Sequence, residues 1–200
     1  MMVRTLVAML AFLAVGSGSA QEAFDLLIQG GRIVDGSGNP WYEADVGIRS
    51  ERVVRIGDLS GATAEAVIDA TGLVVSPGFI DPHTHALRGI FDVPNAESAL
   101  LQGVTTLTEG NDGSSPYPII EHYRAIEDAR ISPNWAVFVG QGTIRSRVIG
   151  SDDRAASPAE LQQMKDMVAA AMEQGALGIS TGLFYGDYIL YKPTGYIYSI

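Results

Sequence analysis

Hydrophobic and polar residues follow two different patterns along the chain, and the change falls near residue 77. Before it, short apolar runs are separated by glycine-containing turns: FDLLIQ, GRIVDGSGNP, ADVGIRSERVVRIGDL and AVIDATGLVVSPG. The third run predicts a hairpin that turns near Ser50 and Glu51. Five or six short strands within about fifty residues predict a small β-sandwich over residues 21–76.

From Pro77 onwards, strand-like and helix-like segments alternate. Strands are predicted for GFIDPHTH, VTTLTEG, NWAVFVGQG and ALGIST, with helices over NAESALLQ, after the prolines of SPYPIIEHYRAIEDAR, and over SPAELQQMKDMVAAAMEQG. Such alternation predicts parallel strands joined by right-handed crossovers. A (β/α)₈ barrel takes typically ~250 residues, so residues 77–200 are interpreted as the first half of a TIM-like barrel in an α/β protein.

The segment that begins at Ser157 has the strongest helix signals. Ser157 is the predicted N-cap, Pro158 suits the first turn, and Glu160 completes a capping box. Gly175 is predicted to end the helix. One face should be buried, and it carries Leu161, Met164, Val168 and Ala171.

Composition narrows the chemistry. The 200-residue chain has a formal net charge of −10, which argues against nucleic acid or an anionic membrane surface as a partner. It contains no cysteine, and this excludes disulfides, thiolate metal sites and a cysteine nucleophile within it.

The first twenty residues have the pattern of a secretory signal. Arg4 precedes an apolar run over residues 6–15, and small residues lead to a predicted cleavage point after Ala20. The run is shorter than the roughly 20 apolar residues of a membrane span, although an uncleaved anchor is the alternative. The mature chain is therefore expected outside the cytoplasm, secreted or in the periplasm, without a stable membrane anchor.

Two of the three histidines stand one residue apart in PGFIDPHTH, at the end of the first predicted barrel strand. Residues i and i+2 of a strand share a face, so His83 and His85 should converge at the carboxyl end, where barrel enzymes hold their active sites. Two imidazoles suit a divalent metal such as zinc. Asp81 is expected to orient one of the rings. The alternative is a buried, hydrogen-bonded histidine pair.

The segment VSPGFIDPHTH resembles the opening strand of the amidohydrolase superfamily. GNPWYEADVGI, GVTTLTEGNDGSS, VGQGTIR and GALGISTGLFY then resemble the N-acyl-D-amino-acid deacylase (D-aminoacylase) family, over residues 24–191. This resemblance implies a β-sandwich beside a metal-bearing barrel, one or two Zn²⁺ ions, and hydrolysis of the amide bond of small N-acyl-D-amino acids. It also implies that His83 and His85 are metal ligands.

Two motifs depart from the family pattern. The GNDG segment has Asp112 where D-aminoacylases often have a metal-binding cysteine, so Asp112 is the favoured third ligand and Glu109 is the rival. Alternatively, Asp112 only stabilises the turn. Gln141 stands where many members have histidine, and it is retained as a hydrogen-bond donor to substrate.

The substrate carboxylate suggests arginine partners. Arg88 and Arg145 are candidates for bidentate binding, and a surface salt bridge is the alternative for Arg145. Ser180 and Tyr185 lie at or just past the fourth strand's end as substrate-binding candidates. By the resemblance, Tyr185 also donates a hydrogen bond in catalysis, and the alternative is an aromatic plug of the barrel mouth. His122 is expected on the surface with no catalytic role.

The resemblance implies further metal-binding histidines on the fifth and sixth strands and a catalytic aspartate on the eighth. These positions would lie beyond Ile200. We therefore expect residues 1–200 to be part of a longer protein and to be inactive alone. The alternatives are another amidohydrolase, acting on cyclic amides or isoaspartyl dipeptides, or an inactive truncated product.

Overall fold

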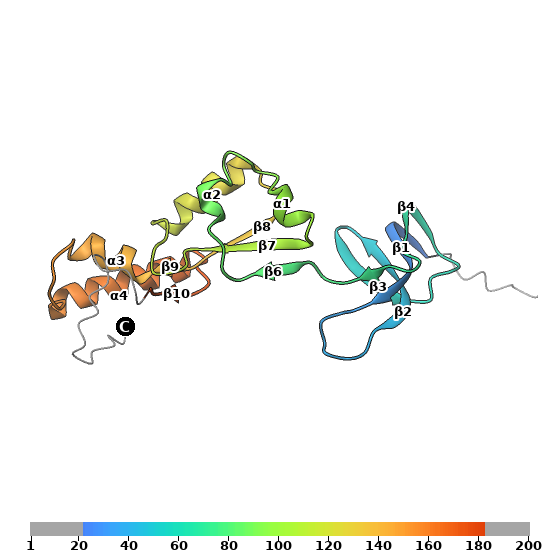
Figure 1. Ribbon diagram of the computed structural model, residues 1–200, viewed down its shortest axis with the longest axis horizontal. Coiled ribbons are helices and arrows are strands. Elements are labelled where there is room, and N and C mark those ends of the chain that lie inside the picture. Colours follow the sequence, from blue (N-terminus) through green and yellow to red (C-terminus); the bar gives the residue numbers. More distant parts are fainter. Residues whose placement is uncertain (1–21, 183–200) are drawn as a thin grey trace, which may run out of the picture. The chain divides into compact units, whose positions relative to one another are not determined.

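The computed structural model describes residues 22–182, and the chain divides into two compact units between Pro77 and Gly78 (Figure 1). The predicted signal segment and Tyr185 lie outside the described residues. Within the described range, none of the helices combines the length and the apolar character that crossing a membrane requires.

The first unit is a five-stranded mixed sheet. Its strands are β1 (Ala23–Ile33), β2 (Tyr42–Arg49), β3 (Arg52–Gly57), β4 (Thr63–Asp69) and β5 (Val74–Val75), in the order β3-β2-β1-β4, with β5 also on β1. The β2–β3 hairpin is confirmed, and Ser50 and Glu51 form its two-residue turn with φ angles of 49° and 63°. The described residues form a single sheet here, so the sandwich stays a prediction.

The first two predicted strands are in fact one strand, β1. The pairing of β1 with β2 shifts register between Ile28 and Gly31. Gly30 adopts a φ of 71°, and its N–H donates to the Asp45 carboxylate at 2.8 Å. The Gly30-Gly31 pair therefore bends the strand without ending it, because glycine accommodates the left-handed conformation at little cost.

The second unit alternates parallel strands with helices, as predicted. Strands β6 (Phe79–Asp81), β7 (Val104–Glu109) and β8 (Asn134–Val137) form one parallel sheet, and β9 (Val139–Gly140) pairs in parallel with β10 (Ile179–Ser180). Only Phe138 separates β8 from β9, and its N–H donates to the Glu109 carbonyl of β7. This is an α/β arrangement, while barrel closure stays a prediction.

The helices of this unit include one that the sequence pattern did not indicate. The expected helices are α1 (Glu97–Leu100), α2 (Ile119–Ala129) and α4 (Pro158–Glu173). A short 3₁₀ helix, η1 (Ala86–Arg88), precedes α1. The additional helix is α3 (Gln141–Val148). The third strand therefore ends at Gly140 instead of continuing to Gly142, because the chain turns into α3. The buried residues of α3 are Gly142, Ile144 and Arg145, a face too short and mixed to give a clear apolar period.

Helix α4 confirms the predicted capping box. The Ser157 hydroxyl accepts from the Glu160 N–H, and the Glu160 carboxylate accepts from the Ser157 N–H. Met164 and Ala171 of the predicted stripe lie in a core shared with α2, α3 and the strands. The buried residues of this core are Ile119, Val137, Val139, Ile144, Ile149, Met164, Ala171 and Ala176.

The prediction that His122 is a surface residue is wrong. Its side chain is buried, and its Nε2 accepts a hydrogen bond from Trp135 Nε1 at 2.9 Å. Ile119, His122 and Ile126 are the buried residues of α2, and their spacing of three and four places them on one helix face. That spacing was present in the sequence, but the polar residue within it concealed the stripe.

Burial makes His122 a source of pH-dependent stability. It lowers the His122 pKa below the ordinary 6.5, and the charge of Glu109 offsets part of this effect. As the pH falls below about 6.5, His122 of the unfolded chain binds a proton more readily than His122 of the folded protein. The free energy of unfolding should therefore fall as the pH falls. Protonated Nε2 also cannot accept from Trp135, at a cost of about 1 kcal/mol.

This effect can be measured by urea unfolding of metal-free protein at about pH 7.5 and about pH 5.5, on either side of the ordinary pKa. Unfolding of the full-length protein is followed by circular dichroism. His122→Gln should show the smaller loss of stability at the lower pH. Equal losses in the two proteins would contradict the assignment to His122.

Candidate metal centre

Three side chains from two loops converge at the carboxyl ends of β6 and β7. His83 and His85 follow β6, and Asp112 follows β7. The spacing of the histidines had suggested that both lie on the strand. Because β6 ends at Asp81, they lie instead in an irregular loop. Their convergence therefore depends on the conformation of this loop and not on strand alternation.

The separations within this group suit a shared cation. The Oδ2 atom of Asp112 lies 3.2 Å from His83 Nε2 and 3.5 Å from His85 Nε2, and the potential ligand atoms all lie within 4.8 Å of one another. Zn–N and Zn–O bonds of about 2.0–2.1 Å in a tetrahedron place neighbouring ligand atoms about 3.3 Å apart. Two imidazoles and a carboxylate are also donors that zinc accepts.

Asp112, and not Glu109, lies with the two histidines. Asp112 adopts a φ of 57°, a left-handed conformation that aspartate tolerates better than most residues. Glu109 is buried, and its Oε1 accepts from Leu87 N at 2.9 Å and from Thr84 Oγ1 at 3.1 Å. The geometry therefore favours Asp112 as the third ligand, although its ligand role stays a prediction.

Asp81 has a different contact from the one expected. Its Oδ1 accepts a hydrogen bond from the backbone N–H of His83 at 3.1 Å, and not from an imidazole ring. The carboxylate lies two residues before this N–H and closes a local turn, since aspartate often binds the backbone two residues on. Asp81 thus helps to shape the start of the histidine loop.

A cavity of about 700 Å³ adjoins the group. Its walls come from the segment after β6, the turn after β7 and the start of α3, and they include His85, Asp112 and the exposed Arg88. Parallel α/β sheets hold ligands at the carboxyl ends of their strands, and this cavity has that position. Arg88 can therefore reach a molecule bound beside the three side chains.

Arg145 was expected either to bind the substrate carboxylate or to form a surface salt bridge, and its position fits neither expectation. It is buried, and its Nη2 donates to the carbonyl oxygens of Asp152 at 2.7 Å and Arg154 at 3.0 Å. It is not among the residues that line the cavity, and it forms no salt bridge with any of residues 22–182. The guanidinium stabilises the segment between α3 and α4, because a charged donor to buried carbonyls is a strong hydrogen bond.

Ser180 and Gln141 occupy the neighbourhood of the turn after β7. The Ser180 hydroxyl donates to the Gly110 carbonyl and accepts from the Gly113 N–H, so it braces the turn that carries Asp112. The Gln141 side-chain oxygen is buried and has no hydrogen-bond partner among residues 22–182. Substrate contacts by either residue stay a prediction.

Sequence reasoning missed Thr84, Asn111 and Thr143. Asn111 Nδ2 donates to the Thr84 carbonyl at 3.0 Å, and Thr143 lines the cavity from α3. Asn111 and Thr84 are 27 positions apart, so no local pattern could pair them. Thr143 was missed because the pattern did not indicate its helix.

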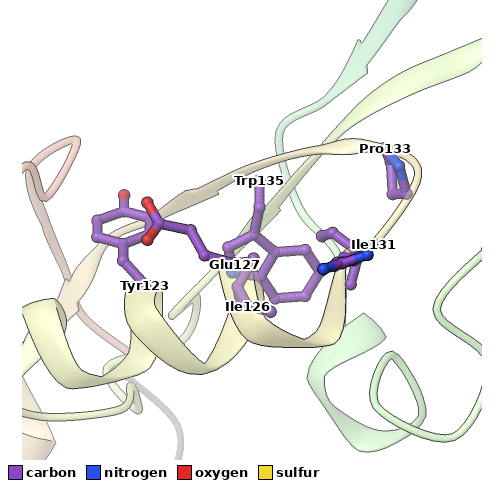
Figure 2. A pocket seen from close by; sticks show the side chains of 7 residues that line it. Tyr123, Ile126, Glu127, Ile131, Pro133 and Trp135 are labelled. Carbon is purple, nitrogen blue, oxygen red and sulfur yellow. The ribbon is translucent and has the colours of Figure 1, made fainter.

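A second hollow, of about 380 Å³, lies between α2 and the segment that leads into β8. Figure 2 shows its mainly aliphatic and aromatic lining, with Tyr123, Ile126 and Glu127 on α2 and Trp135 on β8. None of its lining residues belongs to the histidine–aspartate group. The metal chemistry is therefore assigned to the first cavity.

Residues 66–191 match the amidohydrolase family, and the chain belongs to it. Among characterised relatives, it is 40% identical to a D-aminoacylase of Alcaligenes xylosoxydans xylosoxydans, over 84% of this chain and 40% of the relative. It is 39% identical to an N-acyl-D-glutamate deacylase of the same organism, over 82% of this chain and 38% of the relative. The chain thus spans about two fifths of these relatives.

The fold agrees with this membership. A crystal structure of N-acyl-D-glutamate deacylase from Bordetella bronchiseptica matches with a TM-score of 0.77 and 35% identity, over 84% of this chain and 40% of that one. That protein was solved with zinc and a phosphonate that mimics the tetrahedral intermediate of its reaction.

Proposed function

We propose that the protein to which this chain belongs hydrolyses the amide bond of N-acyl-D-amino acids. The observation that carries the proposal is the convergence of His83, His85 and Asp112 beside a cavity large enough for a small molecule. The identities of 40% and 39% to two D-amino-acid deacylases support the substrate class.

In this proposal the three side chains hold zinc. His83 and His85 would each supply a ring nitrogen, and Asp112 would supply a carboxylate oxygen with its negative charge. Zinc held there would polarise the amide carbonyl and would lower the pKa of water to about 7. Further ligands and the carboxylate that transfers the proton to the leaving amine are proposed to come from outside the described residues.

Arg88 is proposed to bind the substrate carboxylate. Its side chain is exposed on the wall of the same cavity, and a guanidinium can bind a carboxylate through two parallel hydrogen bonds. This would leave the amide beside the histidines. Arg88 follows His85 by three residues, so the two histidine ligands and the substrate anchor would lie in one short segment after β6.

The wider architecture is proposed on the same basis. The parallel strands of the second unit would belong to a TIM-like barrel, and the mixed sheet of the first unit to a β-sandwich. The apolar run over residues 6–15 and the small residues before position 21 support export from the cytoplasm.

The test is an assay of the zinc-loaded full-length protein on matched D- and L-enantiomers of N-acetylated amino acids, with glutamate among them. We expect release of free amino acid from the D-enantiomers and little from the L-enantiomers. The same preparation is offered a cyclic amide and an isoaspartyl dipeptide. Hydrolysis of either of these without hydrolysis of N-acetyl-D-amino acids would overturn the proposal in favour of another amidohydrolase reaction.

A further inference from the structure

We propose that Glu109 is a positioning residue for the metal centre. Its buried carboxylate holds the loop of residues 82–88 in the conformation that directs His83 and His85 towards Asp112. The inference rests on the proposed function, because it assigns a task toward the metal that those three residues would bind.

The histidine loop needs such support. Residues 82–85 form neither helix nor strand, so no regular backbone pairing fixes the ring directions. The two side chains are also 56% and 54% exposed, so packing restrains them weakly. Besides the contact of His83 Nε2 with Asp112 Oδ2, polar contacts to the loop backbone therefore restrain where the rings point.

Glu109 supplies these contacts on both sides of His85. Its Oε1 accepts from the hydroxyl of Thr84, the residue before His85, and from the N–H of Leu87, two residues after it. Glu109 is only 4% exposed and ends β7, so the carboxylate is itself fixed by the sheet. A single rigid acceptor therefore sets the path of the backbone through His85.

Thr84 connects this carboxylate to the rest of the strand end. Its N–H and its hydroxyl both approach the Thr108 carbonyl, at 3.1 Å and 2.7 Å, so the hydroxyl proton is shared between Thr108 and Glu109. Its own carbonyl accepts from Asn111 Nδ2 at 3.0 Å. The residue between the two histidines is thus bound to the segment that immediately precedes Asp112.

The consequence is a fixed relation between the two halves of the metal site. Residues 108–111 hold the histidine loop, and the next residue, Asp112, supplies the third donor. Removing the Glu109 carboxylate would remove its contacts with the Thr84 hydroxyl and the Leu87 N–H together, and Thr84 would keep only its contacts with Thr108 and Asn111. The rings would then have to be ordered when metal binds, which lowers the affinity.

The experiment measures Zn²⁺ affinity of the full-length protein by competition with a chromophoric chelator, together with the absorption spectrum of the Co²⁺-loaded protein. Glu109→Ala should raise the zinc Kd by about 10- to 100-fold, the usual effect of losing a group that orients a ligand. Glu109→Gln should stay within about threefold of wild type, because its amide oxygen can accept the same two hydrogen bonds. Glu121→Ala, on the exposed side of α2, is the control that should change nothing.

The outcomes separate the inference from the proposed function. A wild-type protein that binds no zinc would overturn both. Zinc binding by wild type, together with an unchanged Kd and Co²⁺ spectrum in Glu109→Ala, would overturn the positioning role alone, even if the metal-free variant melts at a lower temperature.

A second pair of variants decides the question if Glu109→Ala does not fold. Thr84→Val removes the shared hydroxyl while keeping the side-chain shape, and Thr84→Ser restores it. We expect Thr84→Val to bind zinc at least about tenfold more weakly and Thr84→Ser to match wild type, since orienting groups affect metal affinity in this range. Equal affinities in these two variants would overturn the inference.

Discussion

Replacing Asp112 with alanine should weaken Zn²⁺ binding by the full-length protein by more than about 100-fold, beyond the usual effect of losing an orienting group. Asp112 is the only one of the three clustered side chains that carries a negative charge as a ligand, and both histidine Nε2 atoms lie within 3.5 Å of its Oδ2. Without it, two neutral imidazoles remain among the described ligand candidates.

The choice of replacement tests the chemistry of the position. Asp112→Cys should retain strong zinc binding, because a thiolate supplies the same charge and is the softer ligand that zinc favours. Asp112→Asn keeps the size and loses the charge, so its affinity should lie between those of the alanine variant and wild type. The measurement is the zinc Kd from chelator competition, followed by activity on an N-acetyl-D-amino acid.

Asp128→Ala is the matched control, since Asp128 is an exposed aspartate on α2 and its loss should leave zinc affinity unchanged. Zinc affinity that is the same in Asp112→Ala and Asp128→Ala would mean that Asp112 only stabilises its turn. In that case Glu109 would return as the candidate carboxylate ligand.

Replacing Gly110 with alanine should lower the free energy of unfolding by roughly 2–5 kcal/mol, as the sum of a backbone penalty and an overlap penalty. Gly110 has a φ of 78°, where an L-residue costs about 1–2 kcal/mol. A Cβ atom there would also overlap the backbone carbonyl oxygen of Phe138, the residue between β8 and β9.

This substitution should also disturb the metal site. Gly110 is followed by Asn111 and Asp112, so relief of the overlap must shift either the Phe138 backbone or the turn that carries Asp112. We therefore expect a weaker zinc affinity in addition to the lower stability. Urea unfolding of the metal-free protein and chelator competition measure the two effects separately.

Gly150→Ala is a closely matched control. Gly150 has a φ of 73°, and a Cβ atom there would meet nothing within 4 Å. It should show the backbone penalty of about 1–2 kcal/mol without the overlap and without a change in zinc affinity. Equal losses of stability in the two variants would show that close approach of the Phe138 carbonyl is not what requires glycine at position 110.

Several features were predictable because their signals are local. The capping box of α4 joins residues three apart, Ser157 and Glu160. The hairpin depends on the two-residue turn at Ser50 and Glu51. The parallel arrangement of β6, β7 and β8 was predicted from the alternation of strands and helices, because a helix that connects two neighbouring strands returns the chain to the same end of the sheet. In each case neighbours in sequence carry the information.

Other features were missed because their causes are not local. His122 is buried and accepts a hydrogen bond from Trp135, and Arg145 is buried and donates to the carbonyls of Asp152 and Arg154. A polar residue type predicts exposure on average, but a specific partner reverses that preference.

The sequence by itself determined the candidate donors: the histidine pair after the first strand of the second unit, and an acidic residue in the turn after the next. Only the tertiary structure decided which carboxylate joins the pair. His83 and Asp112 are 29 positions apart, and Thr84 and Glu109 are 25 apart. Their contacts exist because β6 and β7 pair in parallel and bring their carboxyl ends together, so Asp112 meets the imidazoles while Glu109 supports the loop that carries them.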